Sequence, residues 1–150
     1  MVQRAAKDHP VAGLLLPLRV DLNRTLPFAD ACFDLCVDSY VSCHFAEDII
    51  FRQYWEELGR VTRPKGYVFT SMFCTDDEYY NALPRQCLAG VSLVMDPMNG
   101  ITKRLHDEKH FSRLFPPVFH ISYFVKFQFS DIVLTREYRR SLLVGLLQKL

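Results

Sequence analysis

The chain has 150 residues, of which 49% are hydrophobic, so it can hold one core of ordinary size and has little room for a second domain. Its formal net charge is +1. Residues 1–75 hold 8 basic and 9 acidic residues, and residues 76–150 hold 10 basic and 8 acidic residues. This balance excludes a nucleic-acid-binding surface made by charge alone. No apolar run approaches the roughly 20 residues of a membrane-spanning helix, and Asp8 and Pro10 interrupt any signal-peptide pattern.

The first predicted strand covers residues 14–22, a mostly apolar run whose first half is weakened by Pro17. Asp21 then stands at the carboxyl end of that strand. In open α/β sheets ligands bind outside this edge, so Asp21 is a candidate binding residue. A turn through Asp21, Leu22 and Asn23 is the alternative interpretation.

A strand, a long helix and a second strand follow. Residues 33–37 are a short apolar run bounded by acidic and turn residues, which predicts a buried strand. Apolar residues spaced three and four apart then predict one helix face: Ile50, Tyr54, Leu58 and Val61. Pro64-Lys65-Gly66 is expected to end this helix, with Gly66 supplying the positive backbone angle of a tight turn. With a strand over residues 67–73, the order predicts a parallel pair and a right-handed crossover, within a core region at 14–75.

The strand over residues 33–37 ends at Asp38, Ser39 and Tyr40, which makes these residues a second candidate wall at the same sheet edge. Beyond the next strand, Thr75 and Glu78 have the spacing of a capping box and predict a short helix.

The remainder is predicted as a cover region and a strand pair. Residues 85–100 lack periodicity and are interpreted as a loop, and a short helix is expected over 107–114, within a variable cover region at 85–117. Alternating residues from 118 to 129 predict a long half-exposed strand. A last strand over 139–147 follows too soon for a helical crossover, so residues 118–150 are predicted to form an antiparallel strand pair.

Five cysteines occur at positions 32, 36, 43, 74 and 87 without a CxxC pair, which indicates reduced thiols and predicts a cytoplasmic protein. A zinc site from Cys32, Cys36 and His44 is disfavoured because these residues straddle a buried strand. His106 and His110 have helical spacing but no evident acidic third ligand, so no metal site is predicted.

Two segments, which follow one another along the chain, together resemble class I S-adenosylmethionine-dependent methyltransferases, in particular the small-molecule methyltransferase type 11 domain. They read Leu26-Pro27-Phe28-x-Asp30-x-x-Phe33-Asp34-Leu35 and Glu57-Leu58-x-Arg60-Val61-x-x-Pro64-x-Gly66. The resemblance implies that residues 33–37 and 67–73 are the fourth and fifth strands of that fold. It also implies S-adenosylmethionine as cofactor and a small-molecule acceptor. The cofactor-binding residues it implies are Asp21, Leu22, Asp38, Ser39 and Tyr40, and the catalytic residues are Asp38 and His44.

The chain departs from the family at its N-terminal side. The family's glycine-rich loop after its first strand has no counterpart, since Gly13 is the only glycine before residue 59, and residues 1–8 look like the end of the helix that leads to the third strand. The predicted fold is therefore α/β: a Rossmann-like class I methyltransferase sheet lacking its first two strands and ending in an antiparallel strand pair. Such a truncated domain would expose a sheet edge, which favours pairing with a second copy or another subunit.

Two functions remain open from the sequence. The first is transfer of a methyl group from S-adenosylmethionine to a small molecule, with Asp38 or His44 as the base. The second is a catalytically inactive methyltransferase-like module that binds another chain. Each site residue also has a structural interpretation, because Asp38 suits a strand end and His44 suits packing at a helix start. Likewise, Arg136, Arg139 and Arg140 suit either a phosphate contact or a solvated strand entry.

Overall fold

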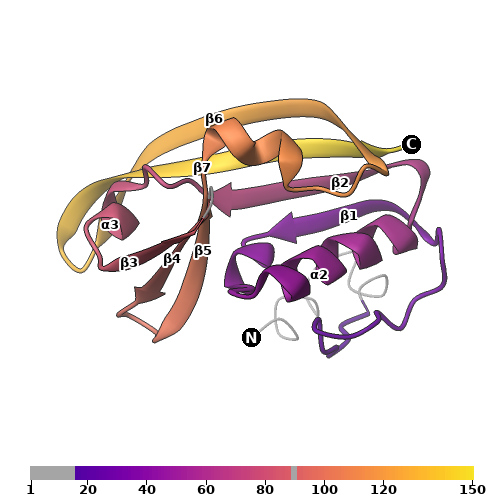
Figure 1. Ribbon diagram of the computed structural model, residues 1–150, viewed down its shortest axis with the longest axis horizontal. Coiled ribbons are helices and arrows are strands. Elements are labelled where there is room, and N and C mark those ends of the chain that lie inside the picture. The colour runs from indigo at the N-terminus through magenta and orange to yellow at the C-terminus, as the bar shows by residue number, and fades with distance from the viewer. Residues whose placement is uncertain (1–15, 89–90) are drawn as a thin grey trace, which may run out of the picture.

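The computed structural model describes residues 16–88 and 91–150, and its main feature is a four-stranded mixed sheet (Figure 1). The strand order is β1-β2-β7-β6. The bounds are Phe33–Ser39 for β1, Thr62–Phe73 for β2, Phe119–Val133 for β6 and Arg136–Lys149 for β7. The predicted α/β class, with a Rossmann-like sheet that closes in an antiparallel pair, is confirmed.

The parallel unit forms as expected. β1 and β2 pair in parallel, with Leu35 opposite Tyr67 and Ser39 opposite Ser71. The connecting helix α2, Asp48–Val61, packs on the sheet because its apolar residues share one face. Its most buried side chain is Trp55, which is fully buried and was not among the residues expected on that face.

The turn between α2 and the paired part of β2 differs from its predicted mechanism. The positive angle falls on Lys65, whose φ is 65°, and not on Gly66. Gly66 is required for space instead, because a Cβ there would lie 2.9 Å from the carbonyl oxygen of Arg63 and 3.0 Å from that of Asp34. The glycine therefore permits a close approach between the turn and the start of β1.

The antiparallel pair of β6 and β7 is confirmed and is longer than predicted. The two strands pair from Phe119 opposite Lys149 to Val133 opposite Arg136. Their two-residue turn is Leu134-Thr135, with φ angles of 49° and 71°. Positive angles at both central residues match the right-handed twist of the strands, which explains why the hairpin extends to the turn itself.

The prediction of a loop over residues 85–100 is wrong, because most of this region forms a second sheet. β3, β4 and β5 lie antiparallel in that order. The bounds of these strands are Arg85–Leu88, Val91–Asp96 and Ile101–His106. The short helix α3, Glu78–Asn81, precedes them. Two 3₁₀ helices lie elsewhere in the chain: η2 at Ser42–His44 and η3 at Glu108–Arg113. The cap of α3 also differs from the prediction, since Asp77, and not Thr75, accepts the Tyr80 backbone N–H at 3.1 Å.

The strand predicted over residues 14–22 is wrong for the described residues 16–22, which form no strand. Asp21 instead starts a turn, in which the Arg24 N–H donates to its carbonyl oxygen at 3.2 Å. Val20 and Leu22 pack against the core without backbone pairing. The helix expected at residues 1–8 lies outside the described residues.

The two faces of the main sheet are covered unequally. On the face toward α2 and η3, Val68, Met72 and Leu143 are fully buried. On the opposite face, Val37 is 61% exposed and Phe127 is 53% exposed. Within residues 16–88 and 91–150, no helix is long and apolar enough to cross a membrane.

Candidate functional site

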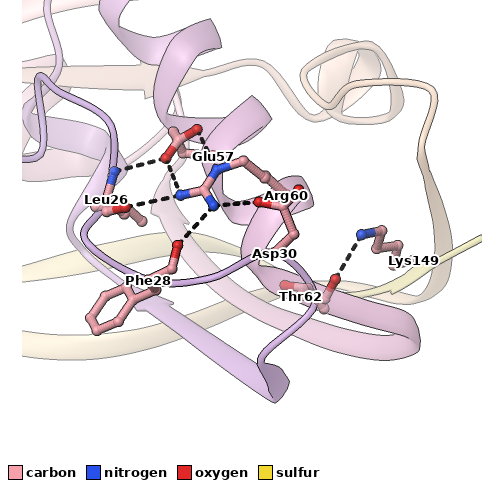
Figure 2. Close-up of polar contacts among 7 residues, drawn as sticks. All are labelled: Leu26, Phe28, Asp30, Glu57, Arg60, Thr62 and Lys149. Atoms are coloured by element: carbon pink, nitrogen blue, oxygen red, sulfur yellow. Dashed lines mark hydrogen bonds and ion pairs between the residues drawn. The ribbon is translucent and has the colours of Figure 1, made fainter.

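The two sequence segments that resemble the family meet at a clasp between α2 and the loop before β1 (Figure 2). Glu57 Oε2 accepts the Leu26 N–H at 2.7 Å. The Arg60 guanidinium donates to the carbonyl oxygens of Leu26 and Phe28, at 2.9 and 2.8 Å, and to Asp30 Oδ1 at 2.7 Å. Glu57 also pairs with Arg60 at 2.8 Å. These residues therefore hold the entry to β1 in place, which is a structural role.

The carboxyl ends of β1 and β2 point toward the β3-β4-β5 sheet (Figure 1). Asp38 and Ser39 lie at this end of β1, and Tyr40 and His44 follow directly in the chain. Asp38 is fully buried beneath this edge. Its carboxylate accepts hydrogen bonds from the Ser42 N–H at 2.9 Å, Ser42 Oγ at 2.6 Å, Thr70 Oγ1 at 2.8 Å and the Tyr54 hydroxyl at 3.3 Å. Burial and the Asp38 charge raise the pKa of Tyr54. The Asp38 carboxylate thus fixes the segment that follows β1.

Ser39 and Tyr40 are exposed at the end of β1, directly above Asp38. The Ser39 and Ser71 hydroxyl oxygens lie 3.2 Å apart and join the ends of β1 and β2. Tyr40 has a φ of 57°, an angle that a bulky residue adopts only where its surroundings enforce it. Its ring lies 5.1 Å from that of Phe73. The chain reversal at Tyr40 leaves both side chains accessible.

His44 is exposed as well, and Lys103 on β5 lies beside it. The Lys103 Nζ atom is 3.4 Å from each ring nitrogen. Partial burial and the positive charge of Lys103 lower the pKa of His44 below its usual 6.5. His44 is therefore mainly neutral at neutral pH and has a nitrogen that can accept a proton.

Asp21 and Leu22 lie apart from the other predicted residues. Asp21 Oδ1 accepts from the Asn23 N–H at 3.1 Å, and its carboxylate pairs with Arg24 at 3.2 Å. The segment that follows joins the C-terminal end of α2 through the clasp with Glu57, whereas Ser39 lies at the other end of β1. The structure thus brings together Asp38, Ser39, Tyr40 and His44 but not Asp21 and Leu22.

Sequence reasoning missed Lys103, the main neighbour of His44. Lys103 is only 7% exposed and lies on β5, between the predicted loop at 85–100 and the predicted helix at 107–114, where no strand was expected. The alternation that could have identified β5 is short and interrupted by charges, so its six residues give little signal. Thr70 and Tyr54 were also missed as partners of Asp38. The sequence shows neither the parallel register that pairs Thr70 with Asp38 nor the packing of α2 that brings Tyr54 to it.

In the part of the chain that the structure describes, no group of three or more His, Cys, Asp or Glu side chains is arranged to hold a metal ion. His106 is fully buried, with its ring 5.2 Å from Phe51. Burial and the adjacent Arg104 lower the pKa of His106 to about 3. Cys32, Cys36, Cys43, Cys74 and Cys87 are free thiols.

Comparisons with known proteins agree with the fold. Residues 1–70 match the family model described as a methyltransferase domain, and a search of curated proteins finds no match. An S-adenosylmethionine-dependent methyltransferase from Methanosarcina mazei is similar in structure, with a TM-score of 0.66 and 22% identity over 87% of this chain and 65% of that one.

Two further solved structures share the fold. A methyltransferase from Mesorhizobium loti has a TM-score of 0.58 and 16% identity over 88% of this chain and 68% of that one. The 1,6-didemethyltoxoflavin N1-methyltransferase of Burkholderia thailandensis, solved with 1,6-didemethyltoxoflavin and S-adenosylhomocysteine, has a TM-score of 0.54 and 15% identity over 87% of this chain and 48% of that one. The chain spans about half to two thirds of the length of these structures. The chain therefore has the fold of class I S-adenosylmethionine-dependent methyltransferases, and its residues 1–70 are similar to a methyltransferase domain.

Proposed function

We propose that this chain supplies one wall of a site for S-adenosylmethionine-dependent methyl transfer to a small molecule. The observation that carries the proposal is the accessible pair Ser39 and Tyr40, held at the carboxyl end of a parallel strand by the buried Asp38 network. In open α/β sheets this edge is where ligands bind. The Burkholderia relative with its bound small substrate supports a small acceptor for this chain as well.

The described residues fit one part of the cofactor. The Ser39 hydroxyl and the Tyr40 phenol are polar groups suited to the amino-acid portion, and the Tyr40 ring offers an apolar surface. Asp38 carries four hydrogen bonds from protein donors. We therefore propose that Asp38 positions Ser39 and Tyr40, and that it does not itself remove a proton. No glycine precedes Gly59 in the described part of the chain, so a backbone cradle of the family type is absent from those residues.

His44 is the proposed base. When bound, the cofactor supplies a methyl group on a positively charged sulfur, and the chain must align the acceptor and take its proton. The lowered pKa of His44 keeps its ring unprotonated at neutral pH. With the cofactor bound, a His44 ring nitrogen would take the proton that the acceptor atom loses on methylation. The positive charge of Lys103 disfavours the protonated His44 ring, so His44 would release the proton again after the transfer.

Isothermal titration calorimetry with S-adenosylmethionine tests this proposal. We expect saturable binding to the unmodified chain, about tenfold weaker binding to the Tyr40→Ala variant, and no change for the control Tyr123→Ala, whose side chain is exposed on the open sheet face. Equal binding by Tyr40→Ala and the unmodified chain would place the cofactor elsewhere. Absence of binding at millimolar cofactor would exclude catalysis by this chain alone.

The alternative function, an interaction module, rests on the outer edge of β1. β1 pairs only with β2 among the described strands, and Leu35 beside this edge is 55% exposed. An apolar groove of about 220 Å³ runs along it. Unpaired edges of this kind favour strand addition by another chain. We propose a second copy as the partner, to be tested by sedimentation equilibrium. A Val37→Lys variant should shift a dimer to monomer, whereas a monomer at all concentrations would exclude the proposed self-association.

A further inference from the structure

A second cavity lies between the start of α2, strand β5 and η3, away from Ser39 and Tyr40. Its volume is about 440 Å³, within the range of small-molecule sites. Its lining residues are Asp48, Phe51, Arg52, Val91, Arg104, His110, Arg113 and Leu114. The lining contains both cationic and apolar side chains. None of these residues takes part in the proposed methyl transfer.

The charged side chains of this cavity are unbalanced. Arg52, Arg104 and Arg113 face a single carboxylate, Asp48, so the formal charge of the lining is +2. Asp48 is already paired with Arg104. Arg52 and Arg113 form no ion pair with any carboxylate in residues 16–88 and 91–150. Two guanidinium groups are therefore available to a ligand.

Arg104 is the buried cation of the cavity, only 4% exposed. Its guanidinium donates to the Ala46 carbonyl oxygen at 3.2 Å and to Asp48, and its central carbon lies 4.5 Å from the centroid of the Phe51 ring. Arg104 Nε and His110 Nδ1 are buried and have no hydrogen-bond partner among the described residues. A desolvated cation with unused donors is costly unless an anion compensates it.

We propose that this cavity binds the phosphate group of a small phosphorylated molecule. A phosphate monoester carries a charge of about −1.5 to −2 at neutral pH, which matches the surplus of the lining, whereas a carboxylate carries half of it. Guanidinium groups match phosphate oxygens in pairs. Phe51, Val91 and Leu114 provide the apolar surface for the organic part of the ligand.

The phosphate site and the methyl-transfer site lie on opposite faces of β5. Successive side chains on a strand point to opposite faces. Lys103 therefore contacts His44, while its neighbour Arg104 faces α2. The phosphate proposal does not rest on methyl transfer, and either can fail without the other.

The test is a titration of the whole chain with inorganic phosphate at constant ionic strength, followed by amide NMR shifts and by the melting temperature. We expect saturable shifts in α2, β5 and η3 and a rise in melting temperature. The variant Arg52→Gln/Arg113→Gln changes two exposed side chains and should bind phosphate at least about tenfold more weakly, since hydrogen bonds to charged groups are involved. Arg139→Gln, an exposed arginine on β7, is the matched control and should bind as the unmodified chain does.

Three results would overturn the proposal. They are a linear, unsaturable response of the unmodified chain to phosphate, equal phosphate binding by the Arg52→Gln/Arg113→Gln variant, and equal binding of acetate and phosphate by the unmodified chain. The linear response and the equal binding of acetate are measured on the unmodified chain, so they test the proposal even if the variant misfolds. A circular dichroism spectrum identical to that of the unmodified chain shows that the variant has folded.

Discussion

His106 is a buried titratable residue whose protonation opposes folding. Its pKa is lowered to about 3 in the folded chain, against 6.5 in the unfolded one, so the unfolded state binds more protons between these values. His106 therefore does not reduce the free energy of unfolding above pH 6.5. Below that pH its protonation in the unfolded state lowers the free energy of unfolding by about 1.4 kcal/mol per pH unit. We expect urea denaturation at pH 7, 6, 5 and 4 to show this slope.

Replacing His106 separates this effect from other acid effects. In a His106→Leu variant, unfolding between pH 6 and 4 should take up about one proton fewer than in the unmodified chain. The free energy of unfolding should therefore depend less steeply on pH. His44→Gln is the control, because the His44 ring is exposed and its pKa is lowered less strongly. An unchanged slope in His106→Leu would show that His106 is not protonated on unfolding.

Asp38 organises the site through its four donors, so its loss should affect folding before chemistry. Asp38→Ala leaves buried donors of Ser42, Thr70 and Tyr54 without an acceptor, and the free energy of unfolding should fall by about 3 kcal/mol. Asp34→Ala on the same strand, whose carboxylate is exposed in a surface ion pair with Arg63, should change it by less than about 1 kcal/mol. Chemical denaturation distinguishes the two, and equal small losses would contradict the network.

The sequence placed Asp38, Ser39 and Tyr40 at a strand end because a short apolar run followed by polar residues is a local pattern. Whether a polar side chain there points into the protein or out of it depends on strand register, which is not local. The buried position of Asp38 and the contact of Lys103 with His44 therefore emerged only from the structure.

At the scale of elements, the clasp between α2 and the loop before β1 should control the order of residues 26–30. In an Arg60→Ala variant the Leu26 and Phe28 carbonyl oxygens lose their donor and Glu57 loses its partner. We expect the Leu26 amide to exchange with solvent at least about tenfold faster, as measured by hydrogen exchange, because local opening becomes easier. Arg63→Ala, which removes an exposed arginine, is the control. Unchanged Leu26 exchange would show that the clasp is dispensable.

Contact between η3 and the sheet depends on Gly145 of β7. A Cβ at this position would lie 2.7 Å from Phe111 Cζ, so Gly145→Ala must displace the buried Phe111 ring. We expect a loss of about 1–3 kcal/mol in unfolding free energy by overpacking. In a Phe111→Leu background the same substitution should be less costly, and a double-mutant cycle measures this coupling. Additive losses would contradict it.

The elements were predictable where the pattern was long or strongly punctuated. α2 and the β6–β7 pair each have periodicity over ten or more residues, and they form as expected. The run from 14 to 22 has strand-like composition, but over the described residues it has no partner strand to complete its hydrogen bonds. Conversely, β3, β4 and β5 are short and carry charged residues, so pairing between them rather than local composition determines that sheet.

For the whole molecule, the open face of the main sheet is the most unusual feature. Tyr123 and Phe127 on β6 and Val37 on β1 are more than half exposed on this face, although apolar faces of sheets are normally covered. The chain also spans about half to two thirds of the length of structures with the same fold.

We propose that the carboxyl end of β1 receives the cofactor. Amide NMR spectra recorded during titration with S-adenosylmethionine test it most directly, because they report the place of binding as well as its strength. We expect saturable shifts at Ser39, Tyr40 and Ser71, none at the β6–β7 turn, and loss of these shifts in Tyr40→Ala. Shifts that saturate elsewhere, or none at millimolar cofactor, would contradict it.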